Sequence, residues 1–175
     1  KEEMIAELKE MIHDTKNDDL RKVLESFISD DKVMEKFTKV PASLQYHYSY
    51  LCGLLEHTLN MVTLCVSIGK RENLDCDLLR AGAVLSGLGK AFSYDVEGVP
   101  ELSLKGGMLG QSVIADRILQ NYIKDLPEDL ALKLNHMVIT RRGPKFPEAA
   151  VLLSVRTCDI QINDFLRVYN NQTGE

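Results

Sequence analysis

His57 is the histidine whose setting most favours a functional role in this sequence of 175 residues. Leu54 lies about one helical turn before it and Met61 about one turn after it, so its side chain lies at the margin of an apolar helical face. Such a histidine is either a functional group or a hydrogen-bonded core residue, and the residues alone favour the second interpretation. His13, beside Asp14 at a helix end, is interpreted as a surface residue.

Asp159 is the more informative side chain because it lies in the apolar stripe of the last predicted helix. An unpaired carboxylate there costs several kcal/mol, so Asp159 needs a metal, a protonated His, an Arg or several N–H donors nearby. The alternative is a wet stripe edge, with a hydrogen bond to a Ser or Thr of the same helix. We expect the stripe to be buried along its whole length, through Val151, Leu152, Val155, Cys158, Ile162 and Phe165.

A basic segment, Arg141-Arg142-Gly-Pro-Lys145, follows the helix that carries His136. Arginine presents a planar fork of donors that binds phosphate oxygens directly. The segment is therefore either a phosphate-binding cluster or a solvated loop between two helices, and the sequence favours the two about equally. Lys90 ends the central predicted helix, where its charge interacts favourably with the helix dipole.

The elements that must position these side chains are almost all helical. Amphipathic segments at residues 4–12 and 20–28 predict a helical hairpin, followed by a short helix that ends before Pro41. The helix at 75–90 is apolar on nearly all sides, which places it at the centre of the fold. Turn residues make 92–107 a loop with at most a short hairpin. The other predicted helices span residues 51–70, 109–124, 127–140 and 147–169, and the predicted fold class is all-α.

Composition and charge exclude several classes of protein. The chain is 45% hydrophobic and 27% charged, which is typical of a globular domain that needs no cofactor for stability. Its net charge of −5 argues against coating nucleic acid or membrane through bulk charge, so any polyanion site must be local. No apolar run is long enough to span a membrane. The four cysteines form no Cys-x-x-Cys pair and indicate a reducing, cytoplasmic environment.

Several segments together match one known pattern. They are the stretch from His47 to Gly-Leu-Leu-Glu-His57-Thr, the stretch Leu79-Arg-Ala-Gly-Ala-Val-Leu-Ser86-Gly87-Leu-Gly-Lys90, then Met108-Leu-Gly-Gln111, Asn135-His136 through Arg141-Arg142-Gly, and Cys158-Asp159. The pattern resembles the HD-domain metal-dependent phosphohydrolases, and most closely the HD domain of YhaM-type 3′–5′ exoribonucleases. It covers about residues 40 to 165.

The resemblance implies a helical bundle whose centre binds one or two divalent metals. The ligands are a His, an adjacent His-Asp doublet and a distal Asp, and the metals activate water and hold a phosphodiester. Here the first His is His57 and the distal Asp is Asp159, but Ser86-Gly87 replaces the doublet. Where the YhaM-like pattern has further histidines, this chain has Gln111 and the pair Arg141-Arg142, whereas His136 is retained.

These departures predict a degenerate metal site. A catalytic zinc usually needs three well-placed protein ligands, and two arginines nearby repel a cation. We therefore expect no catalytic residue, no bound metal and no cofactor. The alternative is a metal-dependent phosphodiesterase, or 3′–5′ exonuclease-like hydrolase, whose single metal is held by His57, His136 and Asp159. The remnant metal-site positions are His57, Ser86, Gly87, Gln111, His136 and Asp159, and the candidate phosphate ligands are Arg141, Arg142, Lys145 and Lys90.

The expected organisation is a helical extension at residues 1–40, one compact HD-like domain at 41–170 and a polar tail at 171–175. The expected function is a nucleic-acid-binding, nucleotide-binding or interaction module of a larger protein, and a pure scaffold is the alternative. Single-stranded RNA or DNA, a nucleotide, and a protein partner or upstream domain are the expected partners; a membrane is not. His57 and Asp159 should be neighbours that form a structural polar pair. Arg141 and Arg142 should reach the mouth of the former metal pocket.

Overall fold

The computed structural model describes residues 1–173 and is built almost entirely of helices, so the predicted all-α class is confirmed. Helices begin where the sequence offers caps: the side chain of Asn17 accepts from two backbone N–H groups at the start of the helix Asp18–Ile28, and that of Asp75 does the same for the helix Cys76–Leu85. A two-stranded antiparallel hairpin, β1 (Tyr94–Asp95) and β2 (Glu101–Leu102), lies in the predicted loop. The helices are α1 (Glu2–His13), α2 (Asp18–Ile28), α3 (Asp31–Phe37), α4 (Gly53–Glu72), α5 (Cys76–Leu85), α6 (Leu88–Ala91), α7 (Leu104–Ile123), α8 (Glu128–Ile139) and α9 (Pro147–Thr173).

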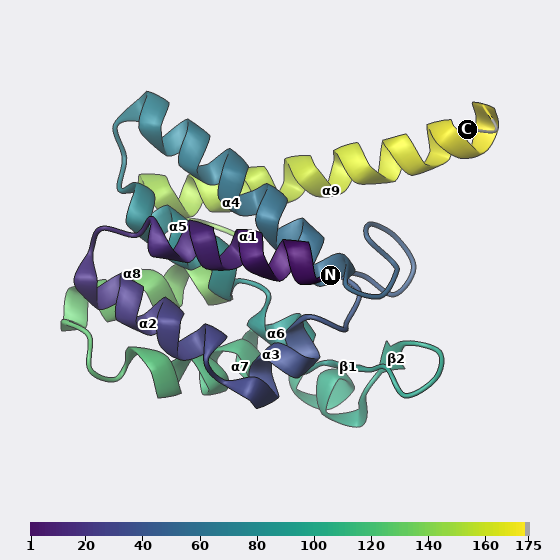
Figure 1. The fold of residues 1–175 in the computed structure, drawn as a ribbon, viewed down its shortest axis with the longest axis horizontal. Helices are drawn as coiled ribbons and strands as arrows, with labels where there is room; N and C mark the ends of the chain where they lie inside the picture. Colours follow the sequence, from purple (N-terminus) through teal and green to yellow (C-terminus); the bar gives the residue numbers. More distant parts are fainter. Residues whose placement is uncertain (174–175) are drawn as a thin grey trace.

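Helix α5 is the centre of the bundle, as its apolar sequence predicts. It packs against α2, α4, α8 and α9, and most of its side chains are buried. Helices α4 and α9 lie side by side across one face of α5, and α2, α7 and α8 form the opposite side of the body (Figure 1). The arrangement is consistent with an HD-type helical bundle, and it brings α4, α6 and α9 together around one small region.

The predicted central helix is not continuous, because it breaks at Ser86-Gly87 into α5 and α6. A side chain on Gly87 would meet the Phe37 ring at 2.8 Å, so the absence of a Cβ allows α3 to pack closely at the break. Helix α7 is kinked at Gly110, whose φ of 73° and ψ of 160° are not helical. The part after the kink corresponds to the predicted helix at 109–124, and the part before it begins at Leu104, within the predicted loop. Its start is stabilised by Ser103, whose hydroxyl accepts from the Gly106 N–H at 3.0 Å.

The apolar stripe of α9 is buried only in its first half. Leu152 and Val155 are in the core, but Ile162 is 51% exposed and Phe165 is 77% exposed. The prediction that the whole stripe is buried is therefore wrong at Cys158, which is exposed, and beyond Asp159. The physical reason is visible in Figure 1, where the second half of α9 extends past the body of the domain.

The N-terminal helices pack onto the rest of the chain and share its hydrophobic core. The Asp77 carboxylate at the start of α5 accepts from the backbone N–H groups of Lys16 and Asn17, at 3.0 and 2.8 Å. The boundary at residue 40 stays a prediction. In the predicted polar tail, helix α9 continues to Thr173, and residues 174–175 lie outside the described residues.

Two further features bear on the expectations from composition. Within residues 1–173 no helix is both long enough and apolar enough to cross a membrane. All four cysteines are free thiols, but only Cys65 is fully buried and Cys158 is exposed.

Candidate functional site

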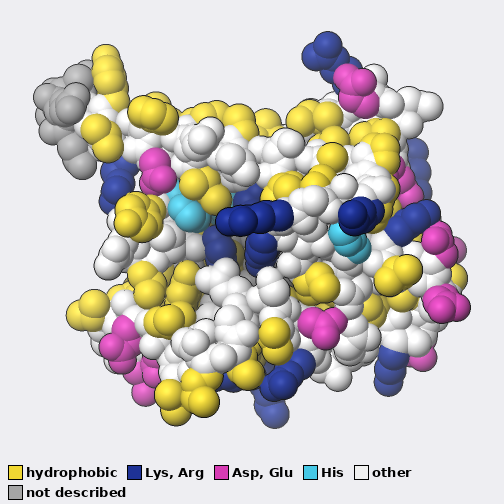
Figure 2. All heavy atoms as spheres, turned by 180° about the vertical axis from the view of Figure 1, so that it is seen from behind, with side chains coloured by type: hydrophobic (Ala, Val, Ile, Leu, Met, Phe, Trp, Pro, Cys, Tyr) yellow, Lys and Arg dark blue, Asp and Glu magenta, His cyan; other side chains and the backbone are white. Residues whose placement is uncertain are grey.

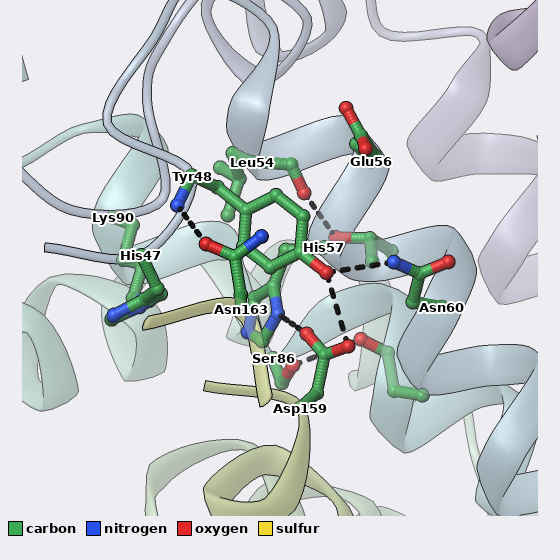
Figure 3. Close-up of polar contacts among 12 residues, drawn as sticks. His47, Tyr48, Leu54, Glu56, His57, Asn60, Ser86, Lys90, Asp159 and Asn163 are labelled. Atoms are coloured by element: carbon green, nitrogen blue, oxygen red, sulfur yellow. Dashed lines mark hydrogen bonds and ion pairs between the residues drawn. The ribbon is translucent and has the colours of Figure 1, made fainter. Parts of the chain in front are cut away.

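His57 and Asp159 form a buried polar pair, which confirms that they are neighbours. The Nδ1 atom of His57 on α4 lies 2.5 Å from Oδ2 of Asp159 on α9. Both side chains are more than nine-tenths buried. The Tyr48 hydroxyl donates to the other carboxylate oxygen at 3.1 Å and accepts from the Asn60 amide at 2.7 Å. Figure 3 shows Tyr48 and His57 converging on Asp159 in this way.

The loop before α4 places Tyr48 over the pair. Tyr48 has a positive φ of 47°, and its backbone N–H donates to the Asn163 side chain on α9 at 3.0 Å. The loop also passes so close to α4 that a Cβ on Gly53 would lie 2.2 Å from the Tyr48 carbonyl oxygen. Only glycine fits at this contact. The first turn of α4 and the loop are therefore fixed against each other, which sets the position of the Tyr48 ring.

Burial holds His57 in its neutral form. Desolvation lowers the pKa of His57, the hydrogen bond to Asp159 opposes this effect, and the positive charges of Lys90 and Arg156 add to the lowering. Burial also raises the pKa of Tyr48 to about 12. The neutral imidazole therefore donates its Nδ1–H to Asp159. Both oxygens of the carboxylate have protein donors, so Asp159 is paired without a metal.

A small cavity adjoins this pair at the break between α5 and α6. It is lined by His57, Ser86, Gly87 and three cationic side chains, Lys90, Arg141 and Arg156. Its volume of about 10 Å³ is at the lower end of the roughly 10–15 Å³ that one water molecule needs. Figure 2 shows Lys and Arg side chains gathered in and around a hollow in the middle of this face of the molecule.

We call Lys90, Arg141 and Arg156 the cation cluster. Burial first, then the positive charges of Arg156 and Arg141, lower the pKa of Lys90 to about 7. Burial, with the charge of Arg141, lowers the pKa of Arg156 to about 9, and burial alone lowers that of Arg141. Among the described residues none of the three forms an ion pair with an acid. The cluster therefore concentrates positive charge in a poorly hydrated place.

Several nitrogen atoms of the cluster are buried and unpartnered within the described residues. They are Nη2 of Arg141 and both terminal nitrogens of Arg156. Buried donors without acceptors are rare in proteins and destabilise the fold. The cluster therefore lacks an acceptor or an anion, which is the complement that its charge and its donors require.

His47, in the loop before α4, contacts the cation cluster. Its Nε2 atom lies 3.4 Å from Nζ of Lys90. Burial first, then the positive charge of Lys90, lower the pKa of His47 to about 4. His47 is therefore neutral near pH 7 and accepts the hydrogen bond from Lys90. Its Nδ1 atom is buried without a partner among the described residues.

The other remnant positions lie around the site but make local contacts. The hydroxyl of Ser86 donates to the Ala83 carbonyl oxygen at 2.9 Å. The Gln111 amide donates to the Tyr94 hydroxyl at 3.2 Å. A Cβ on Gly89 would meet the Gln111 carbonyl oxygen at 2.2 Å, so the start of α6 lies directly against α7. Ser86 and Gly87 line the cavity, whereas Gln111 lines a separate hollow.

His136 lies on α8 and contacts the connection between α8 and α9. One ring nitrogen lies 3.0 Å from the Thr140 hydroxyl, and the other accepts from the Lys145 backbone N–H at 3.2 Å. Arg141 lines the cavity. Arg142 and Lys145 are exposed and do not line it. Of the predicted phosphate ligands, the structure therefore brings together Lys90 and Arg141.

The donor set does not fit the divalent metals that the resemblance implies. His57 and Asp159 are hydrogen bonded to each other, and both ring nitrogens of His136 are engaged in its loop. Among residues 1–173 no group of three or more His, Cys, Asp or Glu side chains could hold a metal ion. The side chains that face the cavity instead carry positive charge and would repel a cation.

Sequence reasoning missed two residues of the site, Arg156 and Tyr48. Arg156 precedes Asp159 by about one turn of α9, so the two side chains share a helix face. An arginine in an apolar stripe beside a buried carboxylate was a usable signal. Tyr48 gave no such signal, because its contact with Asp159 depends on a loop conformation with positive φ.

Comparison with known proteins gives relatives but no matching family model or solved structure. The chain is 26% identical over 177 residues to the 3′–5′ exoribonuclease YhaM of Listeria welshimeri. The same identity, over 175 residues, holds for YhaM of Listeria monocytogenes and of Listeria innocua. Each alignment covers 93% of this chain and 55% of the relative, so the chain spans about half the length of these proteins. This homology is consistent with an HD-domain family.

Proposed function

We propose that this chain is a catalytically degenerate HD-type domain that binds the phosphates of single-stranded RNA, or of a nucleotide, and does not hydrolyse them. In this proposal the domain holds no metal or cofactor and acts in the reducing cytoplasm as a module of a larger protein. The cation cluster occupies the place of the metals and supplies the positive charge that a phosphate needs.

The observation that carries the proposal is the set of buried, unpartnered guanidinium nitrogens of Arg141 and Arg156 beside Lys90. An isolated buried charge is strongly unfavourable, and three together are more so. A phosphate oxygen gives each free N–H an acceptor and neutralises the charge at the same time. Because the cavity is as small as one water molecule, the long cationic side chains must turn to admit the phosphate.

The relatives support RNA as the ligand. Three proteins that align with nearly the whole chain are named 3′–5′ exoribonucleases, so their own ligand is RNA. The present chain keeps the paired His57 and Asp159, but it has Ser86-Gly87 at the metal-binding doublet and arginines at other ligand positions. A binding domain derived from a hydrolase is expected to keep its attraction for phosphate and to lose its metal ligands.

The test is a salt-titrated binding assay with a fluorescently labelled single-stranded RNA. Arg156→Met or Arg141→Ala should weaken binding about 10-fold or more at low salt, since one charge-assisted hydrogen bond contributes about 1.5–3 kcal/mol. Each variant should also reduce the slope of log affinity against log salt by about 1. Arg142→Ala is the matched control, because Arg142 is an exposed arginine of the same loop.

A stability measurement separates lost binding from lost folding. Arg156→Met removes a buried, unpaired charge and keeps most of the side-chain volume, so the free energy of unfolding without RNA should rise or stay unchanged. Equal RNA affinity for the wild type, Arg156→Met and Arg142→Ala would contradict the proposal. So would the absence of binding by the wild type at low salt.

The exposed second half of α9 favours one further candidate, a scaffold role. Ile162, Phe165 and Leu166 lie on consecutive turns and are each at least half exposed. Exposed apolar side chains at helical spacing are typical of a helix that packs on a partner. Loss of a co-purifying partner on Phe165→Asp, with RNA binding absent throughout, would favour this candidate.

A further inference from the structure

Two hollows on the surface share one exposed aromatic side chain, Tyr46. The first has a volume of about 320 Å³ and includes Tyr94 and Gln111 in its walls. The second has a volume of about 280 Å³ and includes Tyr50 and Arg167. The Tyr46 side chain is 60% exposed and that of Tyr50 is 48% exposed. Two accessible rings therefore border the second hollow, and one of them also borders the first.

The loop that carries these rings is tied down at several points. The Tyr46 N–H donates to the Ser43 hydroxyl at 3.2 Å, and the Tyr50 hydroxyl donates to Glu56 on α4 at 2.8 Å. From α9, Arg167 donates to the Gln45 carbonyl oxygen at 3.2 Å. Because the backbone at Gln45 and Tyr46 and the ring of Tyr50 are held, the loop loses little conformational freedom when a planar group stacks on it.

The hollows lie next to the cation cluster. His47 follows Tyr46 in the chain and contacts Lys90, while Gln111 lies against Gly89, the residue before Lys90. An aromatic series also runs outward from the buried pair, with ring centroids 5.4 Å apart for His57 and Tyr48 and 6.2 Å apart for Tyr48 and Tyr50. An RNA strand with one phosphate at Lys90 would therefore place its neighbouring bases over Tyr46.

We propose that Tyr46 and Tyr50 form a stacking platform for unpaired bases, so that the ligand of this site is single-stranded RNA of at least two nucleotides. The inference rests on the proposed function. Bases stack on exposed aromatic rings while cationic side chains hold the backbone, which is the usual basis of single-strand binding. Arg167, which lines the second hollow, adds positive charge there. Duplex RNA is excluded because its bases are already stacked.

The test compares two ligands of equal length and charge: single-stranded RNA with a fluorescent base analogue, 2-aminopurine, and an oligomer of abasic sugar phosphates. The wild type should bind the RNA more tightly than the abasic oligomer and quench the 2-aminopurine emission. Tyr46→Ala should weaken RNA binding about 5- to 100-fold, the effect of removing one base-stacking contact, and abolish the quenching. It should leave binding of the abasic oligomer unchanged.

Two control variants sharpen the test. Tyr46→Phe keeps the ring and should keep both affinity and quenching. Phe165→Ala removes another exposed aromatic ring, outside the two hollows, and should change neither. Equal binding of RNA and abasic oligomer by the wild type, with no effect of Tyr46→Ala, would overturn the platform and leave the cation cluster supported. Absence of binding to both ligands would overturn the proposed function and the platform together.

Discussion

At the scale of single residues, the side chains around the cavity form two different structures. His57 and Asp159 pair with each other and with Tyr48, and this group is satisfied by the protein itself. The cation cluster beside them has buried donors without acceptors. A hydrogen-bonded pair stabilises the fold, whereas unpaired cations destabilise it unless an anion is bound. The pair is therefore the structural part of the site, and the cluster is the part suited to binding.

Removal of the Asp159 carboxylate should be strongly destabilising. Asp159→Ala leaves the His57 and Tyr48 donors buried without an acceptor, so we expect a loss of about 3–5 kcal/mol in the free energy of unfolding. Asp129→Ala is the control, because Asp129 forms an exposed ion pair with Lys133 and should contribute under about 1 kcal/mol. Urea denaturation measures both. A loss under about 1 kcal/mol for Asp159→Ala would show that the pair is not buried in solution.

Lys90 should make both stability and binding depend on pH. Burial, with the charges of Arg156 and Arg141, lowers its pKa from the ordinary value of 10.5 to about 7 in the folded chain. Between these two pKa values the unfolded chain therefore binds more protons than the folded chain, so the free energy of unfolding rises with pH. Below about pH 7 Lys90 is charged in both states, and its destabilising effect on the fold is complete. Lys90→Met should remove the rise, and the exposed-residue control Lys145→Met should keep it. Thermal denaturation at pH 6 to 10 measures this effect.

Binding should change in the opposite direction. As pH rises through about 7, Lys90 loses its charge and RNA affinity should fall in the wild type, while the phosphodiester charge stays constant. In Lys90→Met the affinity should be lower and flat over the same range. An affinity that is independent of pH in the wild type would place Lys90 outside the binding site.

At the scale of elements, close contacts between helices and loops set the geometry. Gly53 lies against the Tyr48 carbonyl oxygen, so Gly53→Ala must displace the loop that carries Tyr46 and Tyr48. We expect Gly53→Ala to cost about 1–3 kcal/mol in unfolding free energy. In Gly107→Ala the added methyl meets only a Leu102 methyl group at 3.8 Å. That control should be neutral or stabilising by up to about 1 kcal/mol, and equal effects of the two substitutions would contradict the tight contact.

Helical periodicity predicted most of the elements, and the differences have identifiable causes. At the break at Ser86-Gly87 the Phe37 ring of α3 packs against Gly87, a contact between distant segments that no local pattern contains. The exposure of Phe165 depends on where the body of the domain ends relative to α9. A period of 3.6 residues indicates which face of a helix is apolar, but not how far a neighbouring element covers it.

The site was predictable to the extent that its residues carry a local signal. Asp159 required a partner because of its apolar setting, and the resemblance pointed to His57. The convergence of Lys90, Arg141 and Arg156 was not predictable in the same way. These residues come from α6, the connection between α8 and α9, and α9, and only the tertiary structure shows that they share a cavity.

At the scale of the whole molecule, local and overall charge have opposite signs. The chain has a net charge of −5, yet it places three cations around one cavity. An acidic surface disfavours nonspecific binding of polyanions, so RNA should bind at the cluster and the adjoining hollows alone. In this proposal the domain acts as one module beside others, since it aligns with about half the length of its relatives.

The most direct test of binding without hydrolysis measures both on the same sample. End-labelled single-stranded RNA is incubated with the purified domain in Mn²⁺, Mg²⁺, Zn²⁺ or EDTA, and bound fraction and RNA length are then determined. The account predicts that binding persists in EDTA and that the RNA stays at full length in every metal. Shortening of the RNA that requires a metal and disappears in His57→Ala would contradict the account and establish a residual hydrolase.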